Sequence, residues 1–386
     1  MQQRRQFLRM SLGLGALGAG LASQAAYLGA WQAAQIGASQ GVPQGASSST
    51  LTRLQDRLIW REKIIQGFGT TLWLRAAHTR ESRLQLALSD AVQALREVEH
   101  LMSLFDAQSL LQRLNREGVV SAVPPDFYRV LALSQHLSER SQGAFDVSMQ
   151  PLWRLWADWA QQQNMGQAQA KAASQITPLA ALGAHQRSAQ LSAGFLADLT
   201  KARAHVNWRG LQLSPQRVQL QPGMALSLNG IAQGYASDKV KAVLQSHGIA
   251  HALLDTGETT MLGDSPQGAW HLAVESAVTN SASTMPAPVL LADGRAVATS
   301  SQAHTSFSAD QRFHHILNPH TGFSPTHWAS VTVLAPSCAL ADGLTKVFFM
   351  LAPEQVMPAA KAWGVDVLLQ SKKGQWIHSP GLRLLA

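Results

Sequence analysis

The chain has 386 residues, of which 46% are hydrophobic and only 14% are charged. Globular chains average about 25% charged residues, and a chain this apolar is not a self-repelling disordered polymer. The net charge of +8 includes Arg4, Arg5 and Arg9. The remaining positive charge is scattered along the chain and forms no run of basic residues, so we expect no nucleic-acid partner. Cys338 is the single cysteine, which excludes an intramolecular disulfide and every cysteine-cluster metal site.

Residues 1–25 have the pattern of a cleavable signal peptide, with a basic start, an uncharged apolar run over residues 10–22 and small residues up to Ala25. The apolar run is too short for a comfortable membrane span. The segment Arg4-Arg5-Gln6-Phe7-Leu8-Arg9 resembles a twin-arginine export signal. We therefore expect the twin-arginine machinery to export the chain to a bacterial periplasm; an ordinary secretion signal or an uncleaved anchor is the alternative. No cysteine lies near the cleavage site, so a lipoprotein is excluded.

The remaining sequence predicts a flexible leader over residues 26–66 and a domain over residues 67–386. Apolar residues alternate with other residues over 70–77, which predicts a strand. Helices are expected from residue 89 onward and around residues 127–137. Residues 157–204, rich in Gln and Ala, form a helical insertion or an irregular excursion.

The second half predicts a more regular order of elements. We expect a short strand over residues 225–228, a turn, a helix whose C-terminal cap is Gly248, and a strand over residues 251–255. A loop over residues 276–288, a strand over residues 330–334 and a helix over residues 340–351 follow. Strands and helices do not alternate steadily, so the predicted fold class is α+β.

Three segments carry residues suited to chemistry. Asn229-Gly230-Ile231-Ala232-Gln233-Gly234 places two glycines at a strand-to-helix junction, which suits either a bound phosphate or tight packing alone. His314 and His315 point to opposite faces of an extended segment, so only one can enter a given site, as a general base or as a structural histidine. Asp342, early in a helix, either favours the helix dipole or binds Mg²⁺ beside a phosphate.

Together these segments resemble the FAD:protein FMN transferases, the ApbE family. The resemblance runs from about residue 70 to residue 352 through six motifs in order. They are Met102-Ser103-Leu104-Phe105-Asp106 with Arg113-Leu114-Asn115, Gly143-Ala144-Phe145-Asp146-Val147 with Leu155-Trp156, Leu228 to Ala236 with Asp238, Ala298-Thr299-Ser300, His315 to Gly322, and Ser330 to Val333 with Ala341-Asp342. It implies an ApbE-like fold of mixed β-sheets flanked by helices.

The resemblance also implies an activity. Family members move the FMN half of FAD onto a Thr or Ser hydroxyl of a partner protein and release AMP, with a base and Mg²⁺ assisting the attack on phosphorus. His315 matches the base, while Asp342 and the Ala232 carbonyl match the metal ligands. The matching FAD-binding positions are Met102, Phe105, Asn229, Gly230, Ala232, Gly234, Ser300 and Thr321.

Two positions depart from the family pattern. Lys346 stands where the family usually has a metal-binding Thr, with Thr345 one residue earlier. The Gly-Gly-Asp turn of the family is here Gly257-Glu258-Thr259, so Glu258 stands in for its carboxylate. We expect the Lys346 stem to turn its charge to solvent, so that Thr345, water or FAD oxygens complete the Mg²⁺ shell. In the alternative, Lys346 itself neutralises pyrophosphate charge.

The export signal and the spelling of the Leu228–Gly234 motif resemble the NosX-type branch that serves nitrous oxide respiration. That branch implies an acceptor flavoprotein with a Thr or Ser flavinylation site, such as a NosR-like membrane protein. Two other functions fit the same residues: a periplasmic protein that binds or delivers flavin without transferring it, and a pyrophosphatase that hydrolyses FAD to FMN and AMP.

Overall fold

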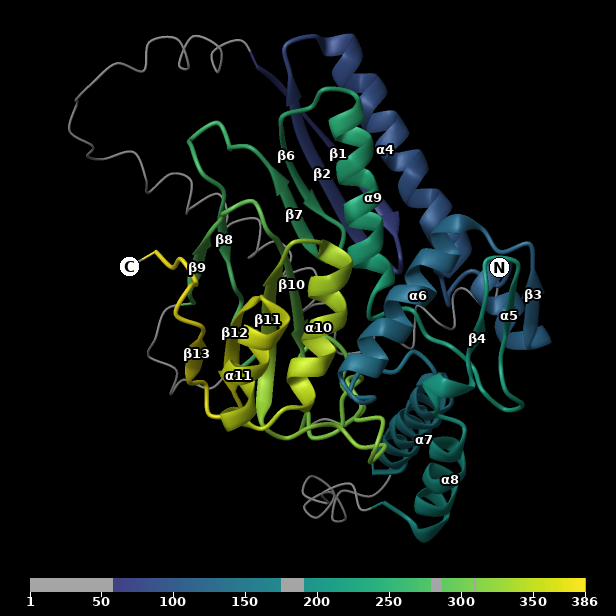
Figure 1. Ribbon diagram of the computed structural model, residues 1–386. Helices are drawn as coiled ribbons and strands as arrows, with labels where there is room; N and C mark the ends of the chain where they lie inside the picture. The colour runs from purple at the N-terminus through teal and green to yellow at the C-terminus, as the bar shows by residue number, and fades with distance from the viewer. Residues whose placement is uncertain (1–57, 175–190, 279–286, 309, 386) are drawn as a thin grey trace.

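An eight-stranded sheet organises the chain in the computed structural model, which describes residues 58–174, 191–278, 287–308 and 310–385 (Figure 1). The strand order is β1-β2-β6-β7-β10-β11-β12-β13. The strands are β1 Ile59–Gly67, β2 Thr70–His78, β6 His251–Asp255, β7 Thr259–Leu262, β10 Ala296–Ser301, β11 Trp328–Ala335, β12 Asp366–Ser371 and β13 Trp376–His378. Every neighbouring pair in this sheet is antiparallel. The expectation of mixed sheets is therefore wrong, because hairpins join β1 to β2, β6 to β7 and β12 to β13.

Alternate residues of the strands face two different hydrophobic layers, as the pleat of a sheet requires. On β2, Leu72 and Leu74 lie on the first face of the sheet, in a hydrophobic cluster with Leu84 and Leu88. Trp73 lies on the second face and packs against a cluster that contains Trp270. That second side also carries the small sheet of β8 (His271–Ala273) and β9 (Val289–Leu291), which are paired antiparallel.

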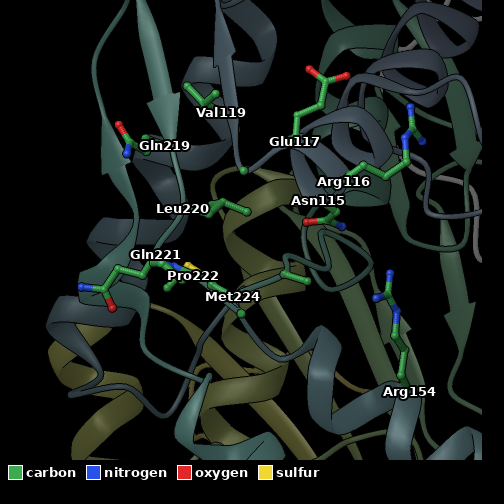
Figure 2. A pocket seen from close by; sticks show the side chains of 13 residues that line it. Asn115, Arg116, Glu117, Val119, Arg154, Gln219, Leu220, Gln221, Pro222 and Met224 are labelled. Carbon is green, nitrogen blue, oxygen red and sulfur yellow. The ribbon is translucent and has the colours of Figure 1, made fainter.

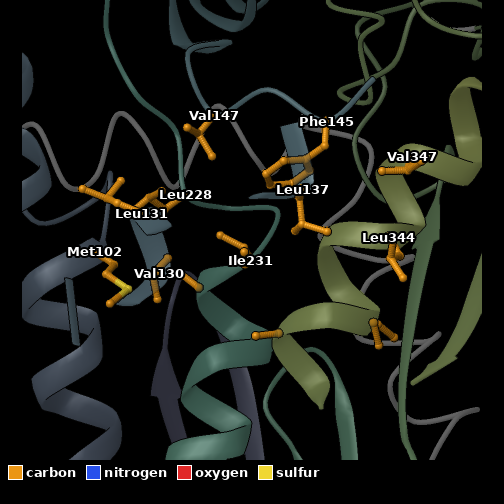
Figure 3. Close-up of a cluster of buried hydrophobic side chains, with 14 of the residues drawn as sticks. Met102, Val130, Leu131, Leu137, Phe145, Val147, Leu228, Ile231, Leu344 and Val347 are labelled. Atoms are coloured by element: carbon orange, nitrogen blue, oxygen red, sulfur yellow. The ribbon is translucent and has the colours of Figure 1, made fainter. Parts of the chain in front are cut away.

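Three helices cover the first face: α4 (Glu81–Met102), α9 (Ala232–Ser246) and α10 (Cys338–Met350). Beside them lie α5 (Leu110–Glu117), α6 (Pro125–Arg140), α11 (Pro353–Trp363), a 3-10 turn at Trp208–Gly210, and a three-stranded sheet of β3 (Val119–Ser121), β4 (Gln212–Leu213) and β5 (Arg217–Gln219). The largest hydrophobic cluster joins the end of α4 to α6, to the start of α9 and to α10 (Figure 3). It fixes the junction before α9 relative to α10.

Helices α7 (Gln150–Ser174) and α8 (Ala193–Ala204) pack against each other and against the long segment between β10 and β11. Their contact is an aromatic cluster in which the Trp156 ring lies 4.8 Å from Phe195 and 4.7 Å from Phe313. The described parts of residues 157–204 are thus helical, as one of the two expectations had it. Residues 175–190 lie outside the described part of the chain.

Most predicted elements are confirmed, with two corrections. Residues 59–66, assigned to the leader, belong to strand β1. Residues 226–228 form no strand, because the Asn115 side chain takes the place of a strand partner: its amide binds both the N–H and the C=O of Leu226, at 2.7 and 2.9 Å. The predicted signal peptide, the leader up to residue 57 and residues 279–286 of the predicted loop lie outside the described residues. No helix within the described ranges combines the length and apolar character needed to cross a bilayer.

Candidate active site

The crossing of α9 and α10 places an acidic side chain beside the start of α9. Gly234 lies so close to α10 that a Cβ atom there would be 2.4 Å from the Cys338 carbonyl oxygen and 2.8 Å from the Asp342 Cβ. The Gly234 N–H donates to Asp342 Oδ2 at 3.2 Å. Asp238 holds the other helix by accepting from Cys338 N at 2.8 Å and Ala339 N at 2.9 Å. The carboxylate of Asp342 is therefore fixed from both helices.

The Lys346 ammonium binds this carboxylate instead of turning to solvent. Its Nζ lies 2.5 Å from Asp342 Oδ1 and 3.2 Å from the Asp342 carbonyl oxygen. The Asp342 side chain is only 1% exposed, whereas that of Lys346 is 23% exposed. The expectation of a solvent-directed lysine is thus corrected. A buried carboxylate left without a partner is strongly destabilising, and a lysine four residues later on the same helix supplies one.

Thr345 faces strand β10 rather than the ammonium. Its hydroxyl donates to the Asp342 carbonyl oxygen at 2.7 Å and lies 2.7 Å from the Ser300 hydroxyl. Thr345 is fully buried, and Ser300 is nearly so. The two predicted site residues are thus brought together, and their pairing fixes α10 on β10.

Glu258, in the turn between β6 and β7, is a second buried carboxyl in this region. It accepts from Thr299 N at 2.9 Å through Oε2. Burial raises the pKa of Glu258 well above its usual range, and the charge of Asp342 raises this pKa further, while Lys346 opposes the shift. The three groups therefore lie close enough to act on one another, with one ammonium among two carboxyls.

These residues, as placed, do not fit Mg²⁺. Both Asp342 oxygens already accept hydrogen bonds, the Thr345 hydroxyl is paired, and an ammonium group cannot ligate a cation. Magnesium requires about six oxygen ligands at 2.0–2.1 Å, and the Lys346 nitrogen lies against the carboxylate oxygen that would bind it. Within the part of the chain that the structure describes, no group of three or more His, Cys, Asp or Glu residues could hold a metal ion.

One ring nitrogen of His315 has no hydrogen-bond partner among the residues that the structure describes. Its Nδ1 lies 2.9 Å from the Thr305 carbonyl oxygen, which can only accept, so the proton is on Nδ1 and Nε2 keeps its lone pair. The pKa of His315 is lowered to about 4, chiefly by burial; the hydrogen bond to Thr305 opposes this shift, and the charges of His304 and Lys346 add to it. The imidazole is therefore neutral at physiological pH, the form that accepts a proton.

The neighbouring His314 is structural, which settles the alternative that the sequence left open for that residue. It is fully buried and its ring packs 6.0 Å from that of Phe349. Its main chain is pinned by Ser324, whose hydroxyl accepts from His314 N and donates to His314 O, both at 2.8 Å. The following turn is held by Trp156, whose indole N–H donates to the Gly322 carbonyl at 2.8 Å. Thr321 is exposed in this turn.

The two residues predicted to hold the flavin differ in placement. Met102 is 1% exposed and belongs to the main hydrophobic cluster (Figure 3), because it ends the apolar stripe of α4. The Met102 side chain therefore packs in the core, and its contact with flavin stays a prediction. Phe105 is 40% exposed, with its ring beside Gly69, where a Cβ would lie 3.5 Å from it. Phe105 is thus accessible for stacking, and that role stays a prediction.

The remaining predicted positions lie at the start of α9. Asn229 is exposed, Gly230 is half-buried under Lys346, and Ala232 is 2% exposed. Neither Asp238 nor the Thr305 carbonyl had a predicted role. Asp238 carried a signal, since an acidic residue within the second turn of a helix can cap a neighbouring helix, whereas a main-chain carbonyl leaves no trace in a sequence.

A pocket of about 440 Å³ opens elsewhere, between the end of α5, the segment 219–225 and Arg154 of α7 (Figure 2). None of the predicted site residues lines it. It therefore plays no part in the arrangement of His315, Lys346 and Asp342.

Comparison with known proteins identifies the family. The model of the ApbE family matches residues 68–369. The FAD:protein FMN transferase of Haemophilus influenzae is 27% identical over 282 residues, covering 71% of this chain and 75% of the relative. The FAD:protein FMN transferase of Treponema pallidum is 28% identical over 319 residues, covering 78% of this chain and 81% of the relative.

Solved structures share the fold. The ApbE protein of Thermotoga maritima superposes with a TM-score of 0.68 at 20% identity, covering 83% of this chain and 97% of the other. The flavin transferase ApbE of Vibrio cholerae gives a TM-score of 0.65 at 24% identity, covering 83% and 97%. Because the family model matches most of this chain, from residue 68 to residue 369, the chain belongs to the ApbE family.

Proposed function

We propose that this chain is an FAD:protein FMN transferase, which moves the FMN moiety of FAD to a Thr or Ser hydroxyl of an acceptor protein and releases AMP. The observation that carries the proposal is the His315 imidazole, whose Nδ1 proton is held by the Thr305 carbonyl so that Nε2 keeps its lone pair. Membership of the ApbE family supports it.

The reaction follows from what each group can do. The acceptor hydroxyl gives its proton to His315 Nε2 as its oxygen forms a bond to the FMN phosphorus. The bond from that phosphorus to the bridging oxygen breaks, and its electron pair leaves with AMP. Thr305 holds the imidazole in the required tautomer, and Phe105 offers an exposed ring on which the isoalloxazine can stack.

The resemblance also implies Mg²⁺. Because the oxygens around Asp342 are already paired, no step of this proposal passes through a metal ion.

The test incubates the chain, from residue 26 onward, with FAD and a candidate acceptor domain. We expect a covalent adduct of FMN mass on the acceptor and one AMP per adduct. His315→Ala should slow transfer by about 10²–10⁴ while FAD affinity, followed by flavin fluorescence, stays within a factor of about two. His327→Ala, an exposed histidine of the same long segment, is the matched control. An equal loss of FAD binding in His315→Ala would make His315 structural.

The two alternative functions give different products. A flavin-binding or flavin-delivery protein, favoured by Lys346 at the expected metal position, binds FAD and releases no AMP. A pyrophosphatase releases AMP and free FMN without an adduct. FAD binding with no adduct on any plausible acceptor would refute the transferase.

The cellular setting is part of the proposal. We propose that a twin-arginine signal in residues 1–25 exports the chain to the periplasm without a lipid anchor, and that the acceptor is a NosR-like membrane protein of the NosX-type branch. The support is the Arg4-Arg5 pair and the spelling Leu228-Asn229-Gly230-Ile231-Ala232-Gln233-Gly234. Changing Arg4 and Arg5 to Lys should retain the chain in the cytoplasm, as cell fractionation would detect. Mass spectrometry of a co-expressed acceptor would identify the modified hydroxyl.

A further inference from the structure

The Lys346 ammonium carries three N–H groups, and the described part of the chain uses only two of them. Of its three N–H groups, two point to the Asp342 carboxylate and the Asp342 carbonyl oxygen. The third has no acceptor among the residues that the structure describes. Because the side chain is 23% exposed, a ligand oxygen can reach this donor while the carboxylate beneath stays buried.

The path of the lysine stem is built into the start of α9. A Cβ at Gly230 would lie 3.0 Å from Lys346 Cε and 3.5 Å from Cδ. Gly230 thus leaves the space that the stem needs to cross from α10 over the junction before α9. The stem therefore passes beside Gly230, while the ammonium binds Asp342 on its own helix.

The same ammonium acts on the base. Burial is the main cause of the lowered pKa of His315 and His304, and the charge of Lys346 lowers both pKa values in the same direction. A divalent ion beside Asp342 would have to displace the ammonium from a carboxylate that is 1% exposed. Breaking such a buried pair weakens Mg²⁺ binding by about a hundredfold or more.

We propose that Lys346 is the built-in cation of this site: its ammonium, held by Asp342, binds the pyrophosphate of FAD in the place of a divalent metal ion. This inference rests on the proposed function for the identity of the anion. A lysine supplies one positive charge where Mg²⁺ supplies two, but it needs no dehydration and no free ion. Asp342 is then a positioning residue that orients the ammonium, rather than a metal ligand.

The first test titrates Mg²⁺ alone into the protein without FAD, by calorimetry. The unmodified chain should show no saturable site at Asp342. Lys346→Thr, which frees the carboxylate and adds a hydroxyl, should bind Mg²⁺ at least about a hundredfold more tightly. Lys361→Thr, the same change on the exposed end of α11, should gain nothing. A saturable site in the unmodified chain that Asp342→Asn abolishes would overturn the proposal.

The second test follows FAD affinity by flavin fluorescence in excess chelator and in Mg²⁺. The unmodified chain should bind FAD equally well in both. Lys346→Thr should lose about tenfold or more in chelator and regain affinity in Mg²⁺, whereas Lys361→Thr should not change. Lys346→Met keeps the stem over Gly230 without its charge and serves if the threonine variant does not fold. The measurements on the unmodified chain need no variant at all.

The outcomes separate the two proposals. If FAD binds in chelator but no acceptor is modified, the transferase is refuted and the role of Lys346 stands. If the unmodified chain loses FAD affinity in chelator while transfer in Mg²⁺ proceeds, the role of Lys346 is refuted and the transferase stands.

Discussion

Replacing Gly234 by alanine tests whether the close crossing of α9 and α10 is what positions Asp342. The added Cβ would lie 2.4 Å from the Cys338 carbonyl oxygen and 2.8 Å from the Asp342 Cβ. The first distance is about 1 Å short of ordinary contact, and the obstacle is helix backbone, which cannot rotate away. The helices must therefore separate, and Asp342 must move with α10.

The size of the effect follows from two opposing terms. Overpacking costs about 1–3 kcal/mol, and backbone contacts place this site near the upper end. Alanine regains about 1 kcal/mol of helix propensity over glycine. The free energy of unfolding should therefore fall by about 2 kcal/mol. At roughly 2.1 cal/mol/K per residue over about 300 residues of the matched domain, Tm should drop by about 3 °C.

Thermal unfolding followed by circular dichroism measures the shift, and FAD affinity reports the displaced site. Gly194→Ala on α8 is the matched control, because its Cβ would meet only the Ser192 hydroxyl, at 3.8 Å. That variant should be as stable as the unmodified chain or more so. A Gly234→Ala protein with an unchanged or raised Tm would refute the reasoning.

Three further outcomes are expected. With a His315 pKa of about 4, kcat/KM for transfer should be flat from pH 8 down to pH 5.5, where a histidine of ordinary pKa would retain only about 10% of its neutral form; a fall centred near pH 6.5 would contradict this. Asp238→Ala should lower the free energy of unfolding by about 1–2 kcal/mol in denaturant titration, since Cys338 N and Ala339 N lose their acceptor. The Cys338 thiol, whose pKa is raised by burial and by nearby carboxylates, should resist a thiol reagent in the folded protein and react once guanidinium unfolds it; rapid labelling of the native protein would show that the helix crossing opens.

Features decided by a few neighbouring residues could be predicted from the sequence. Gly248 was predicted to cap α9, and it follows the helix with φ +78°. The opposite orientation of His314 and His315 follows from extended backbone, and the structure buries the first and leaves the second with a free nitrogen. Glycines and local periodicity suffice for such features.

Features decided by distant residues could not be predicted. Residues 226–228 read as a strand, but the side chain of Asn115, more than a hundred positions earlier, supplies the hydrogen bonds. The orientation of Lys346 depends on how deeply the fold buries Asp342, and burial of one residue is set by the packing of two helices. The side chain of Met102 was assigned to flavin on resemblance, although its place in the apolar stripe of α4 predicted the core.

The aromatic cluster around Trp156 holds one side of the segment that carries His315. Phe313 and Leu317 of this segment pack in that cluster, whereas Ile316 packs in the main cluster with α9 and α10. Sub-global opening of the Trp156 cluster would remove half of the packing that positions the proton acceptor, while the helices that hold Lys346 and Asp342 stay protected from hydrogen exchange. On gentle heating we therefore expect transfer to be lost before FAD binding, and amides of α8 to exchange sooner than those of α10.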